Sequence, residues 1–249
     1  MKVGGRVQSD PSLPSVIAAA VNAGGDLCVV HGGGDEVSAV QRRLGLVPAF
    51  LGGRRVTSEA DLDVVRMVLS GTANKRIVAQ LLGVGIHAAG ISGEDGWLLR
   101  ARVTDPRMGR VGGDITADPA IVVALLSAGF TPVISPVARD VAAPDGAGLN
   151  VNGDDAAGAI ARALGAEELV LVADVAGVLD GPTVLSTLDE GGVRSLIERG
   201  VATGGMLAKL DAAQRALDSG VPAVRIAGIS GIVERDAGTR ITKSSAPAH

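Results

Sequence analysis

Aromatic side chains are almost absent from this 249-residue sequence. Trp97, Phe50 and Phe130 are the only ones, and tyrosine does not occur. Proteins that hold nucleic acids by stacking bases on aromatic rings need more such platforms. The core must therefore be built from Val, Leu, Ile and Ala, a composition that suits a parallel sheet flanked by helices.

Cysteine and histidine are equally scarce. Cys28 is the single cysteine, so an internal disulfide is excluded, and its apolar surroundings predict an inert buried thiol. The histidines, His31, His87 and His249, lack metal-ligand spacing. The sequence supports neither a zinc site nor a Cys–His catalytic pair.

Long apolar runs and blocks of one charge are also missing. No run approaches the length that crosses a bilayer, and no signal-peptide pattern begins at Met1. The net charge is −4 and the pI about 5.4, without a Lys/Arg block beyond pairs, so no footprint for a phosphate backbone is evident. We expect a cytoplasmic protein that binds neither a membrane nor nucleic acid.

Residues 150–181 form the segment around which the rest of the sequence can be interpreted. Polar turn formers precede an alanine-rich run, which Gly165 ends, and an apolar segment at 169–173 leads into an acidic loop. This order predicts a cap, a helix, a C-terminal glycine, a buried strand and a binding loop. Asp154 and Asp155 suit the first turn of that helix. Ligands bind beyond the carboxyl ends of parallel strands, so the final loop is the expected ligand loop.

Two glycine-containing segments could be ligand-binding turns, and their sequence contexts lead to different interpretations. The run His-Gly-Gly-Gly at 31–34 follows an apolar strand at 27–30 and precedes a helix-like run, so its N–H groups could approach an anion. A plain tight turn explains it about equally well. The GxGxxA match at 83–88 follows a predicted helix rather than a strand, so we interpret it as a helix stop and a turn.

Basic residues stand beside several of these turns. Lys2 precedes a glycine pair, and Arg54 and Arg55 follow another. Lys209 is predicted in the first turn of a helix over 206–218, where a cation is mildly disfavoured unless an anion binds nearby. Arginine suits a two-bond grip on a carboxylate. Taken singly, the two lysines are explained by default as exposed surface side chains, and the arginines could be solvated surface as well.

Apolar periodicity predicts the remaining elements. Ser58 and Asp61 have capping-box spacing before a long amphipathic helix over 59–82, whose apolar stripe is either core or a dimer face. Short strands with four arginines over 86–115 suit a lid hairpin or a merely charged surface hairpin. We further expect helices at 16–21, 120–128 and 193–199, strands at 131–135 and 224–227, an edge element at 238–241, a turn at 144–148 and a disordered tail at 244–249.

The order of the motifs is more specific than any one of them. The chain carries Lys-Val-Gly-Gly at 2–5, His-Gly-Gly-Gly at 31–34, Gly-x-Arg-Val-Thr at 53–57, Asn-x-Asn-x-Asp at 150–154, Asp-Val-x-Gly-Val-Leu-Asp at 174–180, Gly-Gly-Met-x-x-Lys at 204–209 and Gly-Thr-Arg-Ile at 238–241. Across nearly its whole length it resembles a member of the amino acid kinase family, in the order found in acetylglutamate kinases.

The resemblance implies a fold and a reaction. The fold is a three-layer αβα sandwich with a mainly parallel open sheet, with a lobe over 1–149 for the acyl amino acid and dimerisation and a lobe over 150–249 for ATP. The reaction is the ATP-dependent phosphorylation of the side-chain carboxylate of N-acetyl-L-glutamate, the second step of arginine biosynthesis. That carboxylate is already ionised, so the chemistry needs positioned positive groups rather than a general base.

The resemblance also implies roles for particular residues. The catalytic residues would be Lys2, Asp154 and Lys209. The substrate would be held by Gly33, Gly34, Arg55, Asn150 and Asn152. ATP would be framed by Gly4, Gly5, Asp174, Val175, Ala176, Gly177, Val178, Leu179, Val201, Ala202, Thr203, Gly204 and Gly205. Mg²⁺ would be held by ATP phosphates and water, so no protein ligand to a metal is named.

The chain departs from the family pattern in three places. Only Met1 precedes Lys2, so either the first strand is shortened or the true start lies upstream. The sequence also lacks the helical extension of arginine-inhibited hexameric relatives. The segment after Gly181 is short, so the lid over the nucleotide would be reduced. We therefore expect a homodimer built on the 59–82 helix, without arginine feedback. Alternatives are a kinase for N-succinylglutamate or for carrier-linked aminoadipate or glutamate, and a non-catalytic sensor of the same fold.

Overall fold

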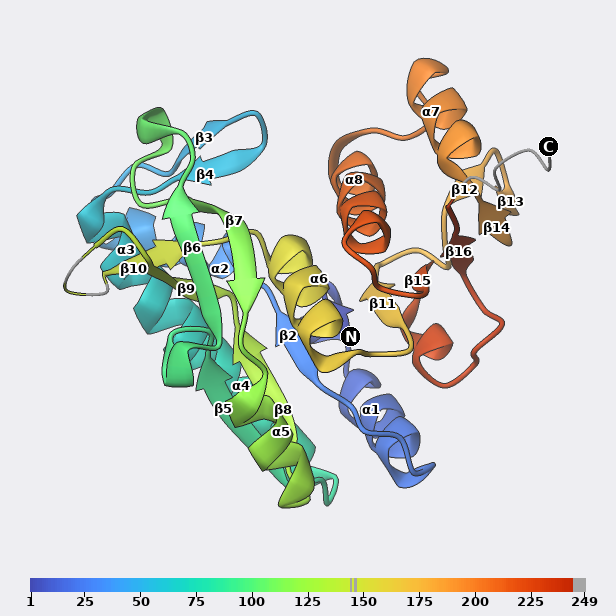
Figure 1. Cartoon of the computed structure of the whole chain (residues 1–249), viewed down its shortest axis with the longest axis horizontal. Coiled ribbons are helices and arrows are strands. Elements are labelled where there is room, and N and C mark those ends of the chain that lie inside the picture. Colours follow the sequence, from blue (N-terminus) through green and yellow to red (C-terminus); the bar gives the residue numbers. More distant parts are fainter. Residues whose placement is uncertain (144, 146, 244–249) are drawn as a thin grey trace.

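The chain folds around an eight-stranded sheet with the order β14-β16-β15-β11-β1-β2-β8-β5 (Figure 1). The computed structural model describes residues 1–143, 145 and 147–243. Within this part of the chain every neighbouring pair in the sheet is parallel except β15 with β16. In sheet order the strands are Thr187–Leu188, Thr239–Ile241, Val224–Ala227, Leu169–Val172, Lys2–Val3, Val29–His31, Thr131–Ser135 and Ala88–Ser92.

Helices cover both faces of this sheet, which confirms the predicted three-layer α/β fold (Figure 1). One face carries α1 (Leu13–Asn22) and α4 (Asn74–Gly83). The other carries α5 (Ala120–Ser127), α6 (Gly153–Leu164) and α8 (Gly204–Asp218). No helix in the described ranges has the length and apolar character that a membrane span requires.

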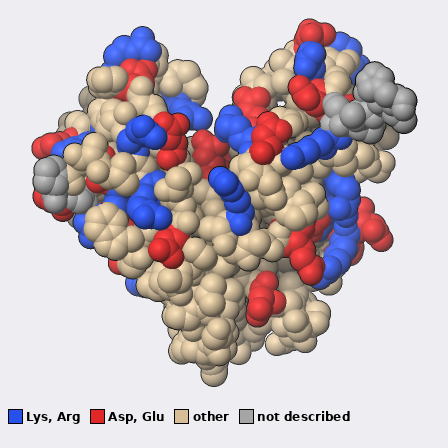
Figure 2. All heavy atoms as spheres, viewed as in Figure 1, with Lys and Arg blue, Asp and Glu red and all other residues tan. Residues whose placement is uncertain are grey.

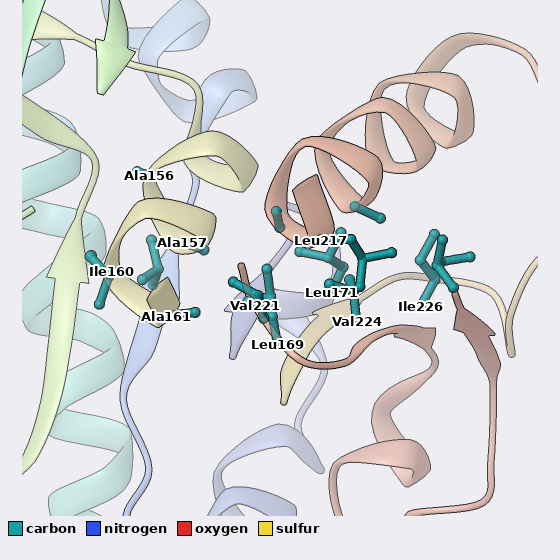
Figure 3. Close-up of a cluster of buried hydrophobic side chains, with 14 of the residues drawn as sticks. Ala156, Ala157, Ile160, Ala161, Leu169, Leu171, Leu217, Val221, Val224 and Ile226 are labelled. Carbon is teal, nitrogen blue, oxygen red and sulfur yellow. The ribbon is translucent and has the colours of Figure 1, made fainter. Parts of the chain in front are cut away.

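The core divides along the sheet because successive strand residues point to opposite faces. Val29 belongs to the cluster under α1 and α4, and Val30 to the cluster under α6 and α8. Figure 3 shows this second cluster, in which small side chains of α6, such as Ala157, face the branched side chains of β11 and β15. A Cβ on Gly158 would lie 3.4 Å from the Cβ of Ala216, so small residues let α6 and α8 approach closely.

Smaller sheets and short helices surround the main sheet. A four-stranded sheet has the order β10-β9-β6-β7, with strands Gly148–Asn150, Val137–Asp140, Leu99–Val103 and Gly112–Ala117. Two hairpins stand apart from it: β3 (Ala49–Leu51) with β4 (Arg54–Val56), and β12 (Leu179–Asp180) with β13 (Thr183–Val184). Further helices are α2 (Gly34–Arg43), α7 (Glu190–Glu198) and the 3₁₀ turns η1 (Val7–Ser9), η3 (Asp95–Trp97), η4 (Pro106–Met108) and η5 (Ile229–Ile232).

The predicted helix over 59–82 exists but changes its winding. It consists of α3 (Glu59–Val65), a π-helical segment η2 (Arg66–Ala73) and α4. Its start is confirmed, because the Ser58 hydroxyl accepts from the Asp61 backbone N–H while the Asp61 carboxylate accepts from the Ser58 N–H. Such π segments are rare and often lie at functional sites.

Three predictions need correction. The 238–241 element is not the edge of the sheet, because the short strand β14 pairs outside β16. Lys209 is in the second turn of α8, since that helix already begins at Gly204. In the 86–115 segment only β6 and β7 form a hairpin, whereas β5 joins the main sheet. The 144–148 turn and the 244–249 tail fall partly or wholly outside the described residues.

Candidate active site

Two lysines from distant parts of the chain meet at one aspartate. Lys2 lies on β1, in the centre of the sheet between β11 and β2, and its Nζ is 2.8 Å from Asp154 Oδ1. Lys209 Nζ, from α8, is 3.4 Å from the same oxygen. The Asn152 side chain holds the start of α6, since its oxygen accepts from the N–H groups of Asp154 and Asp155 at 2.9 and 3.1 Å. The predicted catalytic residues are therefore neighbours in space.

This cluster is shielded from water. The side chains of Lys2, Asp154 and Lys209 are only 10%, 9% and 14% exposed. Burial alone would raise the pKa of Asp154, but the charges of the two lysines outweigh burial and hold its pKa below the usual value. Burial, aided by the charge of Lys2, lowers the pKa of Lys209, while Asp154 opposes that shift. An ionised Asp154 thus keeps two ammonium groups close together in a poorly solvated place.

Gly153 makes room for the Lys2 side chain. A Cβ at this position would lie 3.2 Å from Lys2 Cε and 3.6 Å from the His31 carbonyl oxygen. That approach is closer than most Cβ contacts allow, so with a larger residue here Lys2 Cε would have to shift by a few tenths of an ångström. Sequence reasoning missed this function of Gly153. The available signal was a residue without a side chain between the helix cap and the catalytic carboxylate.

A cavity of about 250 Å³ opens beside this cluster. Its wall combines the glycine loop after β2, the β3–β4 hairpin and the segment that leads into α6, with Val65 and Leu69 forming an apolar side. All five residues predicted to bind the substrate line it, namely Gly33, Gly34, Arg55, Asn150 and Asn152. Their roles stay predictions, but the fold brings them together.

Arg55 is held in this cavity by one face of α2. Its guanidinium donates to the Gly34 carbonyl oxygen at 2.7 Å, to Ser38 Oγ at 2.6 Å and to the Gln41 side-chain oxygen. The Phe50 ring centroid lies 4.9 Å from its Cζ, a cation–π distance. Sequence reasoning missed Ser38 and Gln41. Their spacing places them on one face of the helix that begins at Gly34, which was the available signal.

The glycine loop rests on the π-helical segment. Gly33 has φ +150°, and a Cβ there would come within 2.7 Å of Leu69 Cδ2, so only glycine fits. Beneath the loop, buried His31 donates from Nδ1 to the Gly32 carbonyl oxygen at 2.9 Å. The Asn74 amide donates to His31 Nε2 at 3.2 Å, which requires a neutral imidazole. The loop is thus fixed from below by two buried side chains that sequence reasoning did not select.

His31 should make the stability of the protein pH-dependent. Burial lowers its pKa to about 4, against about 6.5 in an unfolded chain. Between these values the unfolded state binds more protons, so the free energy of unfolding should decrease as the pH falls from 7 to 4, by about 3 kcal/mol in total. Urea titrations across this pH range measure the effect. In His31→Gln this contribution should vanish, and an unchanged slope in that variant would contradict the assignment.

Most of the residues predicted to frame ATP follow two neighbouring central strands, β1 and β11. Gly4 and Gly5 follow β1, and the loop over 174–178 follows β11, so both lie at the carboxyl edge of the sheet. Val178 is buried, and its N–H donates to Thr239 Oγ1 at 2.8 Å. Ala202 is buried as well, so these two residues expose almost no surface. The Val201–Gly205 segment leads into the N-terminus of α8, where unpaired N–H groups favour an anion.

No protein metal centre is evident near these residues. In the described part of the chain, no group of three or more His, Cys, Asp or Glu side chains could hold a metal ion. Cys28 is buried, as predicted, and burial raises the pKa of its thiol to about 11.

Comparison with known proteins gives one consistent result. The family model described as "Amino acid kinase family" matches residues 1–228. The chain is 44% identical to an acetylglutamate kinase of Chloroflexus aurantiacus over 246 residues, which cover 97% of this chain and 95% of that protein. It is 44% identical to an acetylglutamate kinase of Methanopyrus kandleri over 220 residues, 84% of this chain and 88% of that protein.

A solved structure agrees with the sequence comparisons. The N-acetylglutamate synthase of Neisseria gonorrhoeae, in complex with coenzyme A and N-acetyl-glutamate, superposes with a TM-score of 0.81 at 26% identity. The match covers 98% of this chain and 59% of the synthase. The sheet order, the match over residues 1–228 and the identity to full-length relatives agree, and the chain belongs to the amino acid kinase family.

Proposed function

We propose that this protein transfers the γ-phosphoryl group of ATP to the side-chain carboxylate of N-acetyl-L-glutamate. The observation that carries the proposal is the pair of ammonium groups on Asp154, placed beside a cavity that contains Arg55. Similarity to acetylglutamate kinases over nearly the whole chain supports the choice of substrate. The proposed reaction is the second step of arginine biosynthesis and, on the sequence prediction, takes place in the cytoplasm.

The site suits a reaction between two anions. Lys2 and Lys209 would offset the charge of the transferring phosphoryl group, and Asp154 would orient both and keep them charged. The N–H groups of Gly33 and Gly34 would donate to the reacting carboxylate, which needs no general base. Mg²⁺ would arrive with ATP, held by phosphates and water. In this scheme the 1–149 lobe binds the acceptor, together with Asn150 and Asn152 at the start of the second lobe, and the 150–249 lobe binds the nucleotide.

A panel of acceptors tests the proposal. ADP release should depend on N-acetyl-L-glutamate, with much weaker turnover of N-succinylglutamate and of carrier-linked aminoadipate, because the chain is 44% identical to acetylglutamate kinases. Preferred turnover of a carrier-linked acceptor would assign the chain to that alternative. Absence of turnover with every acceptor, in a folded protein that binds ATP, would favour the sensor.

Arg55 should control the affinity for the acceptor. Arg55→Lys keeps the charge but loses the fork that can bind a carboxylate with two parallel bonds, so the KM for N-acetyl-L-glutamate should rise by about tenfold or more. The KM for ATP should stay nearly constant, because Arg55 lies in the acceptor cavity. Initial rates with each substrate varied in turn, at a saturating concentration of the other, measure both KM values. An equal rise in both KM values would argue against this assignment.

We further infer a homodimer that uses the surface of the α3–η2–α4 helix. The exposed apolar side chains of Met67, Leu82 and Val84 lie on or directly after this helix and support the proposal. Light scattering should give the mass of two chains, with activity insensitive to arginine. A hexamer inhibited by arginine would contradict it.

A further inference from the structure

A second carboxylate lies directly after the catalytic one and joins three elements. Asp155, in the first turn of α6, accepts from Arg54 Nη2 of β4 at 3.3 Å. It also accepts from Nε and Nη2 of Arg215, on α8, at 3.1 and 2.7 Å. The Asp155 side chain is mostly buried, whereas both arginines are about half exposed. We call this set the Arg54–Asp155–Arg215 bridge.

Two residues of the bridge are adjacent in the sequence to site residues, and the third lies on the same helix as one. Arg54 precedes Arg55 on β4, and successive strand residues point to opposite faces. Arg55 accordingly binds α2 in the acceptor cavity, while the guanidinium of Arg54, a residue that also lines this cavity, reaches α6. Asp155 likewise follows Asp154, and Arg215 lies on the helix that carries Lys209. A displacement of β4 would therefore reach both the acceptor cavity and α8.

Apart from the hydrogen bonds that Arg55 donates to α2, the β3–β4 hairpin has few other connections. It forms a two-stranded sheet of its own, and all three residues of β3 are exposed. Beyond the hairpin, the Thr57 N–H donates to the Met108 carbonyl oxygen at 3.0 Å. A segment with few buried contacts opens at low free-energy cost, and the ion pair from Arg54 to Asp155 is a contact that joins this hairpin to α6.

The bridge crosses the groove between the two arms of the molecule, one of which contains β4, β7 and α6 and the other α8. This groove, of about 440 Å³, is bounded by β7, α6 and α8, and Figure 2 shows opposite charges facing each other in the notch between the arms. Arg162 lines the same groove from α6, and it has no ion-pair partner in the described part of the chain. It therefore offers a control arginine in the same electrostatic surroundings.

We propose that the Arg54–Asp155–Arg215 bridge couples acceptor binding to nucleotide binding. The inference rests on the proposed function. An acceptor bound by Arg55 fixes the β3–β4 hairpin, so that Arg54 keeps its ion pair with Asp155. Asp155 in turn holds α8 through Arg215, in the position that brings Lys209 to the site. Each ligand therefore binds better when the other is present, and by linkage the enhancement is the same in both directions. Arg54, Asp155 and Arg215 are positioning residues, since they act through Arg55 and Lys209.

Calorimetry tests this coupling. The Kd of a non-hydrolysable ATP analogue with Mg²⁺ is measured with and without saturating N-acetyl-L-glutamate. The wild type should bind the analogue about fivefold or more tightly with the acceptor present. In Arg54→Gln and in Arg215→Gln this enhancement should fall below about twofold, and the double variant should lose no more than either single one. Arg162→Gln should keep the wild-type value.

Salt provides a second readout. Because both arginines are half exposed, added NaCl should weaken the coupling in the wild type and in Arg162→Gln, but leave Arg54→Gln unaffected. A wild type without coupling, or an Arg54→Gln variant with full coupling, overturns the inference while the wild type still turns over N-acetyl-L-glutamate. A wild type that neither binds nor phosphorylates N-acetyl-L-glutamate refutes the proposed function instead, and the inference fails with it.

Discussion

Lys209→Ala should lower kcat by about a hundred- to a thousand-fold, the usual effect of removing one group that stabilises transition-state charge. The reason is geometric. Lys209 brings its ammonium group to within 3.4 Å of Asp154 in a place that is nearly closed to water, where a fixed charge acts strongly on a transferring phosphoryl group. The KM values should change less, because the Lys2–Asp154 pair and the Arg55 cavity remain.

The control for this prediction is Lys243→Ala, which removes an exposed lysine and should leave kcat unchanged. Urea unfolding of both variants should stay close to that of the wild type, so that a loss of rate cannot be attributed to a loss of fold. A Lys209→Ala protein that turns over at more than about a tenth of the wild-type rate would contradict the assigned role.

Arg225→Ala should lower the free energy of unfolding by about 3–5 kcal/mol, the range for removing one partner of a buried ion pair. Arg225 is only 2% exposed. It donates twice to the Glu168 carboxylate, at 3.0 and 2.9 Å, and to the carbonyl oxygens of Gly231 and Ala237 at 2.8 and 2.7 Å. Its removal would leave a carboxylate and two carbonyl oxygens without these donors.

Urea unfolding measures this loss, with Arg235→Ala as the matched control. Arg235 belongs to the same loop but is exposed, so its removal should change the free energy of unfolding by less than about 0.5 kcal/mol. If Arg225→Ala cost less than about 1 kcal/mol, the buried network could not be what holds the loop over 228–238 against β15.

The local structure was largely predictable because its signals are local. Gly165 ends α6 in a left-handed conformation with φ 62°, as the glycine after an alanine-rich run predicts. The run Leu-Val-Leu-Val at 169–172 is the parallel strand β11 that its apolar pattern indicated. The type of helix over 66–73 was not predictable in the same way. The 66–73 segment has helical periodicity, and its π form becomes visible only in the assembled structure.

The site was predictable only in part. The meeting of Lys2 with Lys209 depends on the insertion of β1 between β11 and β2, which no spacing along the chain encodes. The family resemblance supplied that pairing, and the distances to Asp154 agree with it. The groups that hold Arg55 and the space that Gly153 leaves for Lys2 are properties of packing. Sequence patterns alone do not report packing.

Trapping of the product with hydroxylamine tests the central claim most directly, because an acyl phosphate reacts with it to give a hydroxamate. Wild-type protein with Mg-ATP and N-acetyl-L-glutamate should form the hydroxamate. Lys2→Ala and Lys209→Ala should each form it about a hundredfold or more slowly, and the double variant should be little slower than either, since both cations serve one phosphoryl group. Hydroxamate formation by the double variant at the wild-type rate, or none by the folded wild type, would contradict the account.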